Sequence, residues 1–238
     1  MDGMLSQDEI NALLSGMDPG DSAGAAPAEP AAAASASSDD VLSDVEKDAV
    51  GEVANISMGS SATTLYSLVN RKVNITTPVV SMVNWDGVTD DYEKPCVFIQ
   101  IHYTAGLDGS NILVLREHDV KVITDLMMGG DGTNTDGELG ELHLSAISEA
   151  MNQMMGASAT SMSSMLGIPV DISTPDVNKI DVDSVKMFEK MFELPENHFV
   201  KVTFHMEVGD LIDSIMVQLY PLHFAEDMIK KFAINKSE

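Results

Sequence analysis

One stretch of this sequence occurs twice, and the second copy follows the first at a constant distance. Glu52 recurs as Glu149 and Asn55 as Asn152, in each case 97 positions later. The matched positions are Asp48, Glu52, Asn55, Gly59 and Pro78 in the first copy and Ser145, Glu149, Asn152, Gly156 and Pro175 in the second. One match arises easily by chance, but five in register do not. The spacing is too long for a solenoid unit, so we predict a duplicated half-domain with pseudo-two-fold symmetry and two equivalent sites.

Each copy has the same order of expected elements, which is a helix, three strands and a second helix. In the first copy, a capping box of Ser43 and Glu46 begins a long helix that ends near residue 69. Strands are expected at about 72–82, 96–103 and 111–115, and a helix at 118–128. The second copy is expected to contain a helix at about 139–166, strands at 170–177, 199–207 and 214–219, and a helix at 222–232. We predict an α+β domain in which the long, paired helices pack on a shared six-stranded antiparallel sheet.

The chain divides into three parts by composition. Residues 1–16 contain a short amphipathic helix, and residues 17–40 are a flexible linker of mainly Ala, Pro, Gly, Ser and Asp. Residues 41–238 form the expected folded domain, with repeats at about 41–135 and 136–233. The second repeat is longer because of an insertion at about 186–196, to which the sequence assigns no role.

The N-terminal helix has a defined start and one apolar face. Ser6 and Glu9 form a capping box, and Ile10, Leu13 and Leu14 fall at i, i+3 and i+4. So short a helix is marginal alone in water, so its apolar stripe needs either the main domain or a partner. The flexible linker that follows favours a tethered partner-binding peptide over a helix docked on its own domain.

The acidic composition excludes some kinds of partner. The chain carries 38 acidic and 13 basic residues, with a formal charge of −25. Binding to a phosphate backbone requires Lys and Arg, so we expect no nucleic acid partner. The single cysteine, Cys96, permits no intramolecular disulfide, and neither a leader nor a transmembrane segment is recognisable. We therefore expect a cytoplasmic protein.

The sequence shows no pattern typical of a metal or cofactor site. None of the six histidines has the i, i+4 spacing to acids or cysteine that would indicate a metal site. The segment 131–137 resembles a calcium loop superficially, but Thr133 and Thr135 stand where an EF-hand has Asp or Asn. We predict that the chain binds no metal and no small-molecule cofactor of its own.

The chain is also rich in methionine, with 17 in all. Several lie on the second long helix, namely Met151, Met154, Met155, Met162 and Met165. Adaptable core packing is the favoured interpretation, and a promiscuous binding face is the alternative.

The repeated acid and amide suggest a chemical role. Glu52 and Asn55 are three residues apart, as are Glu149 and Asn152, so each pair projects from one face of its helix. A carboxylate pairs with a lysine, whereas a carboxamide both donates and accepts hydrogen bonds and can orient a water molecule. Orienting a water for in-line attack is a task that phosphoryl transfer requires. A merely solvated helix face is the alternative, and the repetition of both residues argues against it.

The motif resembles that of the CheC, CheX and FliY phosphatase family of bacterial chemotaxis. The family pattern has Asp or Ser, then Glu, Asn and Pro, and it is matched by Asp48, Glu52, Asn55, Pro78 and by Ser145, Glu149, Asn152, Pro175. The segment LSQDEINALL resembles the peptide with which the flagellar switch proteins FliM and FliY bind phosphorylated CheY. The resemblance covers the peptide and nearly all of residues 41–233. The presence of both features points to the FliY group, whose members normally continue into a FliN-like domain, whereas this chain stops at Glu238.

The resemblance implies a mechanism and a set of partners. Glu52 or Glu149 would pair with the lysine of the phosphorylated response regulator, and Asn55 or Asn152 would hold the attacking water. The phosphoaspartate and its Mg²⁺ would belong to CheY. The expected partners are phosphorylated CheY and the switch proteins FliM, FliN and FliG, at the cytoplasmic face of the flagellar basal body. The residues expected in the CheY-binding peptide are Leu5, Ser6, Gln7, Asp8, Glu9, Ile10, Leu13 and Leu14.

Two hypotheses about function follow. In the first, the chain is an enzyme that hydrolyses the aspartyl phosphate of CheY, and the tethered helix delivers the substrate. In the second, it is a non-catalytic switch component that binds phosphorylated CheY and transmits the signal structurally. The repeated Glu and Asn pairs favour the enzyme.

Overall fold

The computed structural model describes residues 42–84, 95–180 and 198–237. The expected N-terminal peptide, the linker and the 186–196 insertion lie outside these ranges. The first repeat contains α2 (Asp44–Val69), β1 (Val73–Asn84), β2 (Cys96–Ala105), β3 (Gly109–Arg116) and α4 (Glu117–Met127). The second contains α5 (Glu141–Leu166), β4 (Asp171–Ile172), β5 (Asp176–Ile180), β6 (His198–Val208), β7 (Ile212–Pro221) and α7 (Leu222–Lys236).

The two long helices keep the register of the repeat at both ends. Their first residues, Asp44 and Glu141, and their last residues, Val69 and Leu166, are each 97 positions apart. The residues that follow, Asn70 and Gly167, both adopt a left-handed conformation, with φ of 50° and 67°. Such a residue ends a helix by turning the chain away from its axis. The duplication predicted from side chains therefore extends to the backbone of the helix ends.

The sheet confirms the predicted pseudo-two-fold arrangement. Its strand order is β1-β6-β7-β3-β2-β4, with β5 also paired with β2, and every pairing is antiparallel. Exchanging each strand for its counterpart in the other repeat reverses this order and leaves it otherwise unchanged. The symmetry axis therefore passes between β3 and β7, which pair at the centre of the sheet.

The number of strands differs from the prediction, because the strand expected at 170–177 is divided. It forms β4 and β5, so the sheet has seven strands rather than six. The interruption contains Pro175, which has no N–H to donate to a ladder. In β1 the matching Pro78 coincides with a register shift between Thr76 and Val79, but the strand continues. The same proline therefore produces an irregularity in one repeat and a break in the other.

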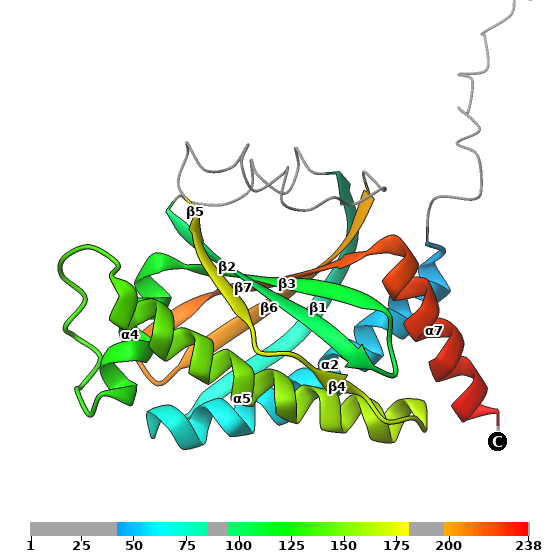
Figure 1. Cartoon of the computed structure of the whole chain (residues 1–238), viewed down its shortest axis with the longest axis horizontal. Helices are drawn as coiled ribbons and strands as arrows, with labels where there is room; N and C mark the ends of the chain where they lie inside the picture. The colour runs from blue at the N-terminus through cyan, green and yellow to red at the C-terminus, as the bar shows by residue number, and fades with distance from the viewer. Residues whose placement is uncertain (1–41, 85–94, 181–197, 238) are drawn as a thin grey trace, which may run out of the picture. The chain divides into compact units, whose positions relative to one another are not determined.

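The core lies between the sheet and the paired helices (Figure 1). Helices α2 and α5 contact each other along one face of the sheet, and α4 and α7 lie at opposite ends of α5. The inner face of β2 supplies Val97, Ile99, Ile101 and Tyr103 to this core. Four of the five methionines named above, Met151, Met154, Met155 and Met162, are at most 2% exposed. Core packing is thus the confirmed interpretation of the methionines on this helix.

Candidate functional site

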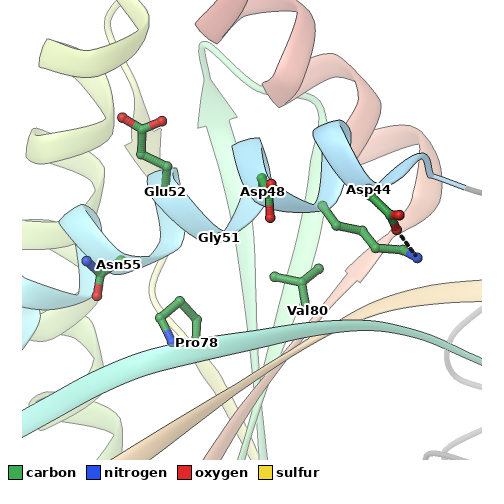
Figure 2. A pocket seen from close by; sticks show the side chains of 8 residues that line it. Asp44, Asp48, Gly51, Glu52, Asn55, Pro78 and Val80 are labelled. Carbon is green, nitrogen blue, oxygen red and sulfur yellow. Dashed lines mark ion pairs between the residues drawn. The ribbon is translucent and has the colours of Figure 1, made fainter. Parts of the chain in front are cut away.

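The first copy of the motif lines a groove between α2 and β1. We call it groove 1, and it has a volume of about 680 Å³. Its lining residues are Asp44, Lys47, Asp48, Gly51, Glu52 and Asn55 of α2, and Pro78 and Val80 of β1 (Figure 2). All four motif residues of the first copy are therefore brought together, although Pro78 lies 23 positions beyond Asn55 in the sequence.

The catalytic candidates of groove 1 are accessible from solvent. Glu52 and Asn55 are exposed, and Pro78 is half-buried. Figure 2 shows Asn55 beside Pro78, whereas Glu52 points away from β1. Gly51 lines groove 1 without a side chain, and a Cβ atom there would make an ordinary van der Waals contact with Val80 Cγ2 at 3.5 Å. Longer side chains at this position would extend into the groove.

Glu52 is engaged by a lysine from the other end of the chain. Lys236, the last residue of α7, places its Nζ 3.0 Å from Oε1 and 2.9 Å from Oε2 of Glu52. The same Nζ lies 4.6 Å from the centre of the Phe232 ring, within the range of a cation–π contact. The Glu52 and Lys236 side chains are 46% and 59% exposed. The pair is therefore largely hydrated, and a partner protein has access to both groups.

The second copy of the motif has a different setting on α5. Ser145 and Glu149 are exposed, Asn152 is half-buried, and Pro175 is buried. Gln153 Nε2 donates a hydrogen bond of 2.6 Å to Glu149 Oε1. In the described ranges, no lysine, arginine or histidine forms an ion pair with Glu149. The Glu149 carboxylate therefore has a neutral partner, Gln153, whereas the Glu52 carboxylate has a positively charged partner, Lys236.

The neighbours of the proline differ as well. Ser148 stands at the position that Gly51 occupies in the first copy, and its Oγ donates a 3.5 Å hydrogen bond to the carbonyl oxygen of Pro175. This contact ties α5 to the segment between β4 and β5. The first copy has Gly51 at the equivalent place, so it has no matching side-chain hydrogen bond from the helix to the proline segment.

Three neighbours of the motif, Lys47, Lys236 and Gln153, were not predicted from the sequence. Gln153 follows Glu149 by four residues, so the i, i+4 rule for helices provided a usable signal. Lys47 lies one helical turn before Gly51 and also lines groove 1. Lys236 is 184 positions from Glu52. No local pattern joins residues so far apart, so only the structure identifies this contact.

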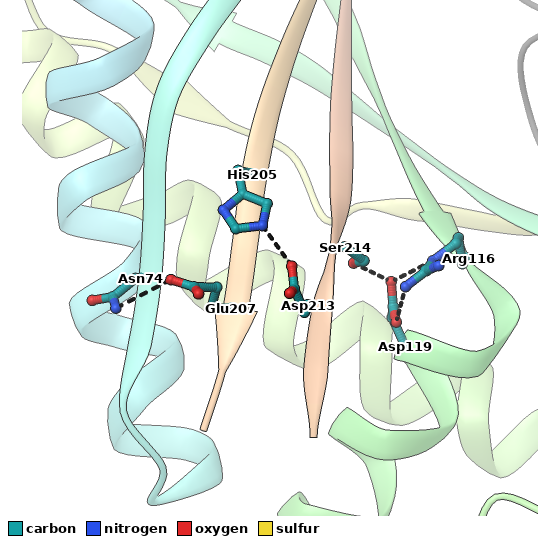
Figure 3. A network of polar contacts seen from close by, with 7 residues as sticks. All are labelled: Asn74, Arg116, Asp119, His205, Glu207, Asp213 and Ser214. Carbon is teal, nitrogen blue, oxygen red and sulfur yellow. Dashed lines mark hydrogen bonds and ion pairs between the residues drawn. The ribbon is translucent and has the colours of Figure 1, made fainter. Parts of the chain in front are cut away.

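A second set of polar contacts joins Arg116, Asp119 and Ser214, none of which lines groove 1 (Figure 3). Asp119, which is fully buried, accepts hydrogen bonds of 3.2 Å from Arg116 Nε and Nη2 and one of 2.6 Å from Ser214 Oγ. A buried carboxylate is stable only when it is paired and hydrogen-bonded in this way. The network joins β3, α4 and β7, so we assign it a structural role.

The residues that the structure describes contain no group of three or more His, Cys, Asp or Glu side chains placed to hold a metal ion. None of their helices is both long enough and apolar enough to cross a membrane. The polar side chains that line groove 1 are three carboxylates, one carboxamide and the Lys47 ammonium.

Comparison with known proteins gives related sequences for both copies. The model of the CheC-like family matches residues 45–82 and 142–178, the two segments that contain the motif. The flagellar motor switch phosphatase FliY of Bacillus subtilis (strain 168) is 47% identical over 234 residues, which are 98% of this chain and 58% of that protein. The chain thus spans less than two thirds of the length of this relative.

Two further relatives extend the comparison. The CheY-P phosphatase CheC of Bacillus subtilis (strain 168) is 24% identical over 160 residues, covering 65% of this chain and 76% of CheC. The X-ray crystal structure of Thermotoga maritima FliY superimposes with a TM-score of 0.76 at 41% identity. That match covers 82% of this chain and 99% of the Thermotoga chain. Its fold agrees with the duplicated α+β architecture described above.

Proposed function

The chain belongs to the FliY group of the CheC-like family, and from that premise we propose that it hydrolyses the aspartyl phosphate of phosphorylated CheY. The observation that carries the proposal is the repeated pair of Glu and Asn on the solvent-facing sides of α2 and α5. Neither residue contributes to the core, so packing does not explain why both recur 97 positions apart. The names of two relatives, a flagellar motor switch phosphatase and a CheY-P phosphatase, support this substrate.

The proposed mechanism positions a water molecule rather than forming a covalent intermediate. Glu52 or Glu149 pairs with a lysine of CheY and fixes the orientation of the two proteins. Asn55 or Asn152 then accepts a hydrogen bond from a water and holds it in line with the phosphorus atom. The water oxygen bonds to phosphorus as the bond to the aspartate oxygen breaks. Inorganic phosphate, which keeps the protons of the water, and the free carboxylate are released.

The charge of the phosphoryl group is neutralised by the substrate's own metal in this mechanism. CheY would carry the Mg²⁺, which stabilises charge on the phosphoryl oxygens. The carboxylates of groove 1 would serve protein recognition instead of metal binding. We therefore propose that the chain supplies orientation and a placed amide, and that it needs no metal or cofactor of its own.

The N-terminal peptide would raise the local concentration of the substrate. In this proposal, residues 5–14 capture phosphorylated CheY, and the linker at 17–40 holds it near both helices. The proposed further partners are the switch proteins FliM, FliN and FliG, at the cytoplasmic face of the flagellar basal body. Their involvement rests on the FliY relationship.

The decay of acid-labile phosphate on CheY in the presence of Mg²⁺ tests the enzyme hypothesis. We expect the intact chain to accelerate the decay. The acceleration by the Asn55→Ala/Asn152→Ala double variant should be at least about a hundredfold smaller, which is the effect of removing one oriented hydrogen-bonding group. A chain lacking residues 1–40 should keep its maximal rate but require more CheY. Binding of phosphorylated CheY by the intact chain without faster decay would favour the non-catalytic switch component.

A further inference from the structure

The two repeated glutamates, Glu52 and Glu149, differ in the charge of the side chain that donates hydrogen bonds to their carboxylates. Glu52 receives the Lys236 ammonium on both of its oxygens, at 2.9 and 3.0 Å. Glu149 receives the carboxamide of Gln153, which is neutral. At the position of Gln153 the first copy has Ile56, which cannot donate a hydrogen bond. The difference therefore arises both from α7 and from the helix that carries each glutamate.

Among the described residues, the lengths of α4 and α7 explain why Glu52 contacts a lysine and Glu149 does not. Helix α4 of the first copy contacts α5, and helix α7 of the second copy contacts α2. Helices α4 and α7 therefore occupy corresponding places in the two copies. Helix α4 ends after 11 residues, whereas α7 has 15. The additional last turn of α7 carries Lys236. Its counterpart is missing from α4, because the chain leaves the helix after Met127.

We propose that Lys236 determines which of the two sites the response regulator uses, by competing with the regulator's lysine for Glu52. This inference rests on the proposed function, in which the same carboxylate pairs with a lysine ammonium of the substrate. Two ammonium groups repel each other and cannot share one exposed carboxylate at full strength. The substrate must displace Lys236 before it engages groove 1, whereas at Glu149 the neutral amide of Gln153 brings no positive charge that competes with an ammonium group. The second copy is therefore the preferred site.

The size of the effect follows from the exposure of the pair. An ion pair that is about half exposed contributes little to stability, and pairs of this kind correspond to roughly a two- to fivefold change in an equilibrium constant. The competition acts on substrate binding only. Once Lys236 has moved, Glu52 and Asn55 act as they would without it, so KM changes and kcat does not.

The test isolates each site in the full-length chain. In the Glu149→Ala/Asn152→Ala background only the first copy is complete, and Lys236→Gln is expected to lower KM for phosphorylated CheY about two- to fivefold with kcat unchanged. In the Glu52→Ala/Asn55→Ala background the target of Lys236 is absent, so the same substitution is expected to leave KM unchanged. Lys236→Arg should restore the higher KM in the first background, because the charge is retained.

A matched control separates this contact from net charge. Lys230 is an exposed lysine of the same helix, and Lys230→Gln removes the same charge at a different place. It is expected to leave KM unchanged in both backgrounds. Equal effects of Lys230→Gln and Lys236→Gln would show that overall charge sets KM and would overturn the proposal. A lower kcat for Lys236→Gln in the first background would also overturn it, because Lys236 would then assist Glu52.

Binding measurements keep this inference separate from the proposed function. Titration with beryllofluoride-activated CheY reports affinity without turnover. If no variant accelerates phosphate decay but Lys236→Gln still tightens binding when only the first copy is complete, the enzyme hypothesis fails and the competition stands. If turnover is normal and neither KM nor affinity depends on Lys236, the competition fails and the enzyme hypothesis stands.

Discussion

Helices α2 and α5 are alike in length and in the positions of their ends, yet the residues around their shared glutamate and asparagine differ. On α2, Gly51 lines groove 1 and Lys236 forms an ion pair with the glutamate. On α5, Ser148 hydrogen-bonds to the Pro175 segment and Gln153 engages the glutamate. The duplication has thus preserved the helices and the motif but not their neighbours. Identical residues in two copies do not make two identical sites.

The two prolines support the same conclusion. Pro78 lies half-buried in a strand that continues past it, whereas Pro175 is buried at a break between two short strands. A proline needs a place in the sheet where no N–H is required, and the two copies provide that place in different ways. The fold therefore keeps some features the same in both copies, such as the helix ends, whereas the surroundings of the proline differ between them.

The largest expected effect concerns the shared core. Met58 and Met155 occupy equivalent positions and are 0% and 1% exposed. Replacing either with Ala should cost about 2–5 kcal/mol of unfolding free energy, because a cavity remains in a packed core. Urea unfolding of both variants is expected to give similar losses, and Met128→Ala, at a 63% exposed position, should cost far less. A large difference between Met58→Ala and Met155→Ala would mean that the pseudo-symmetry does not extend to core packing.

The next effect concerns the two amides. If the second copy is preferred, Asn152→Ala should remove more of the phosphatase activity than Asn55→Ala at low CheY concentration. At saturating CheY the two losses should become more similar, because the competition affects binding. Initial rates of phosphate release at several CheY concentrations measure both. Equal losses at every concentration would contradict a difference between the sites.

A smaller effect is expected from Gln153. In a chain whose first copy is inactivated by Glu52→Ala/Asn55→Ala, Gln153→Ile should raise KM roughly fivefold, since a hydrogen bond that orients a carboxylate contributes about 1 kcal/mol. The matched change is Ile56→Gln in a chain whose second copy is inactivated. If Gln153→Ile lowers KM instead, the amide hinders the regulator and does not position Glu149.

The smallest effect concerns the starts of the long helices. Ser43 Oγ accepts a hydrogen bond from Glu46 N, and Glu46 Oε2 accepts one of 2.7 Å from Ser43 N, whereas α5 begins after Gly140, which has no side chain to cap it. Ser43→Ala should cost about 1 kcal/mol, and Gly140→Ser should gain a few tenths of that, as thermal unfolding would measure. If Gly140→Ser lowers the stability instead, the start of α5 depends on the backbone of Gly140, whose N–H donates a hydrogen bond to His143 Nδ1.

The same cap has a pH dependence. Hydrogen bonds from Ser43 lower the pKa of Glu46 below its usual 4.5. A lowered pKa in the folded state gives stability that is present above the unfolded value and is lost as the pH falls through the folded value. The stability difference between the intact chain and Ser43→Ala should therefore shrink below about pH 4.5. A constant difference down to low pH would mean that the Glu46 carboxylate contributes nothing.

The sequence was sufficient for the long helices, the antiparallel pairing and the motif, because each leaves a local or periodic signal. The capping box at Ser43 was recognisable from two residues three positions apart, and the structure confirms it. The roles of Glu52, Asn55, Glu149 and Asn152 remain predictions. The division of the strand expected at 170–177 was not foreseen, because its counterpart in the first copy, β1, continues past the matching Pro78.

The environment of each site could not be predicted from the repeat. A repeat reports which residues match, and the differences that matter here lie at unmatched positions such as Ile56 and Gln153. The Lys236 contact depends on one extra helical turn at the end of the chain. Its partner is distant in sequence, so neither propensity nor periodicity connects the two.

The order of strands in the sheet also has a consequence for synthesis on the ribosome. Among the strands that the structure describes, β1 pairs with β6 alone, and β4 and β5 pair with β2 alone, so each repeat completes the sheet of the other. The first repeat can form its β2–β3 hairpin early, but β1 can complete its pairing only after residue 208 has emerged from the exit tunnel. Such long-range pairing slows folding and leaves strand edges exposed in the meantime. The nascent chain is thus most exposed to aggregation and to chaperones while its second half is being translated.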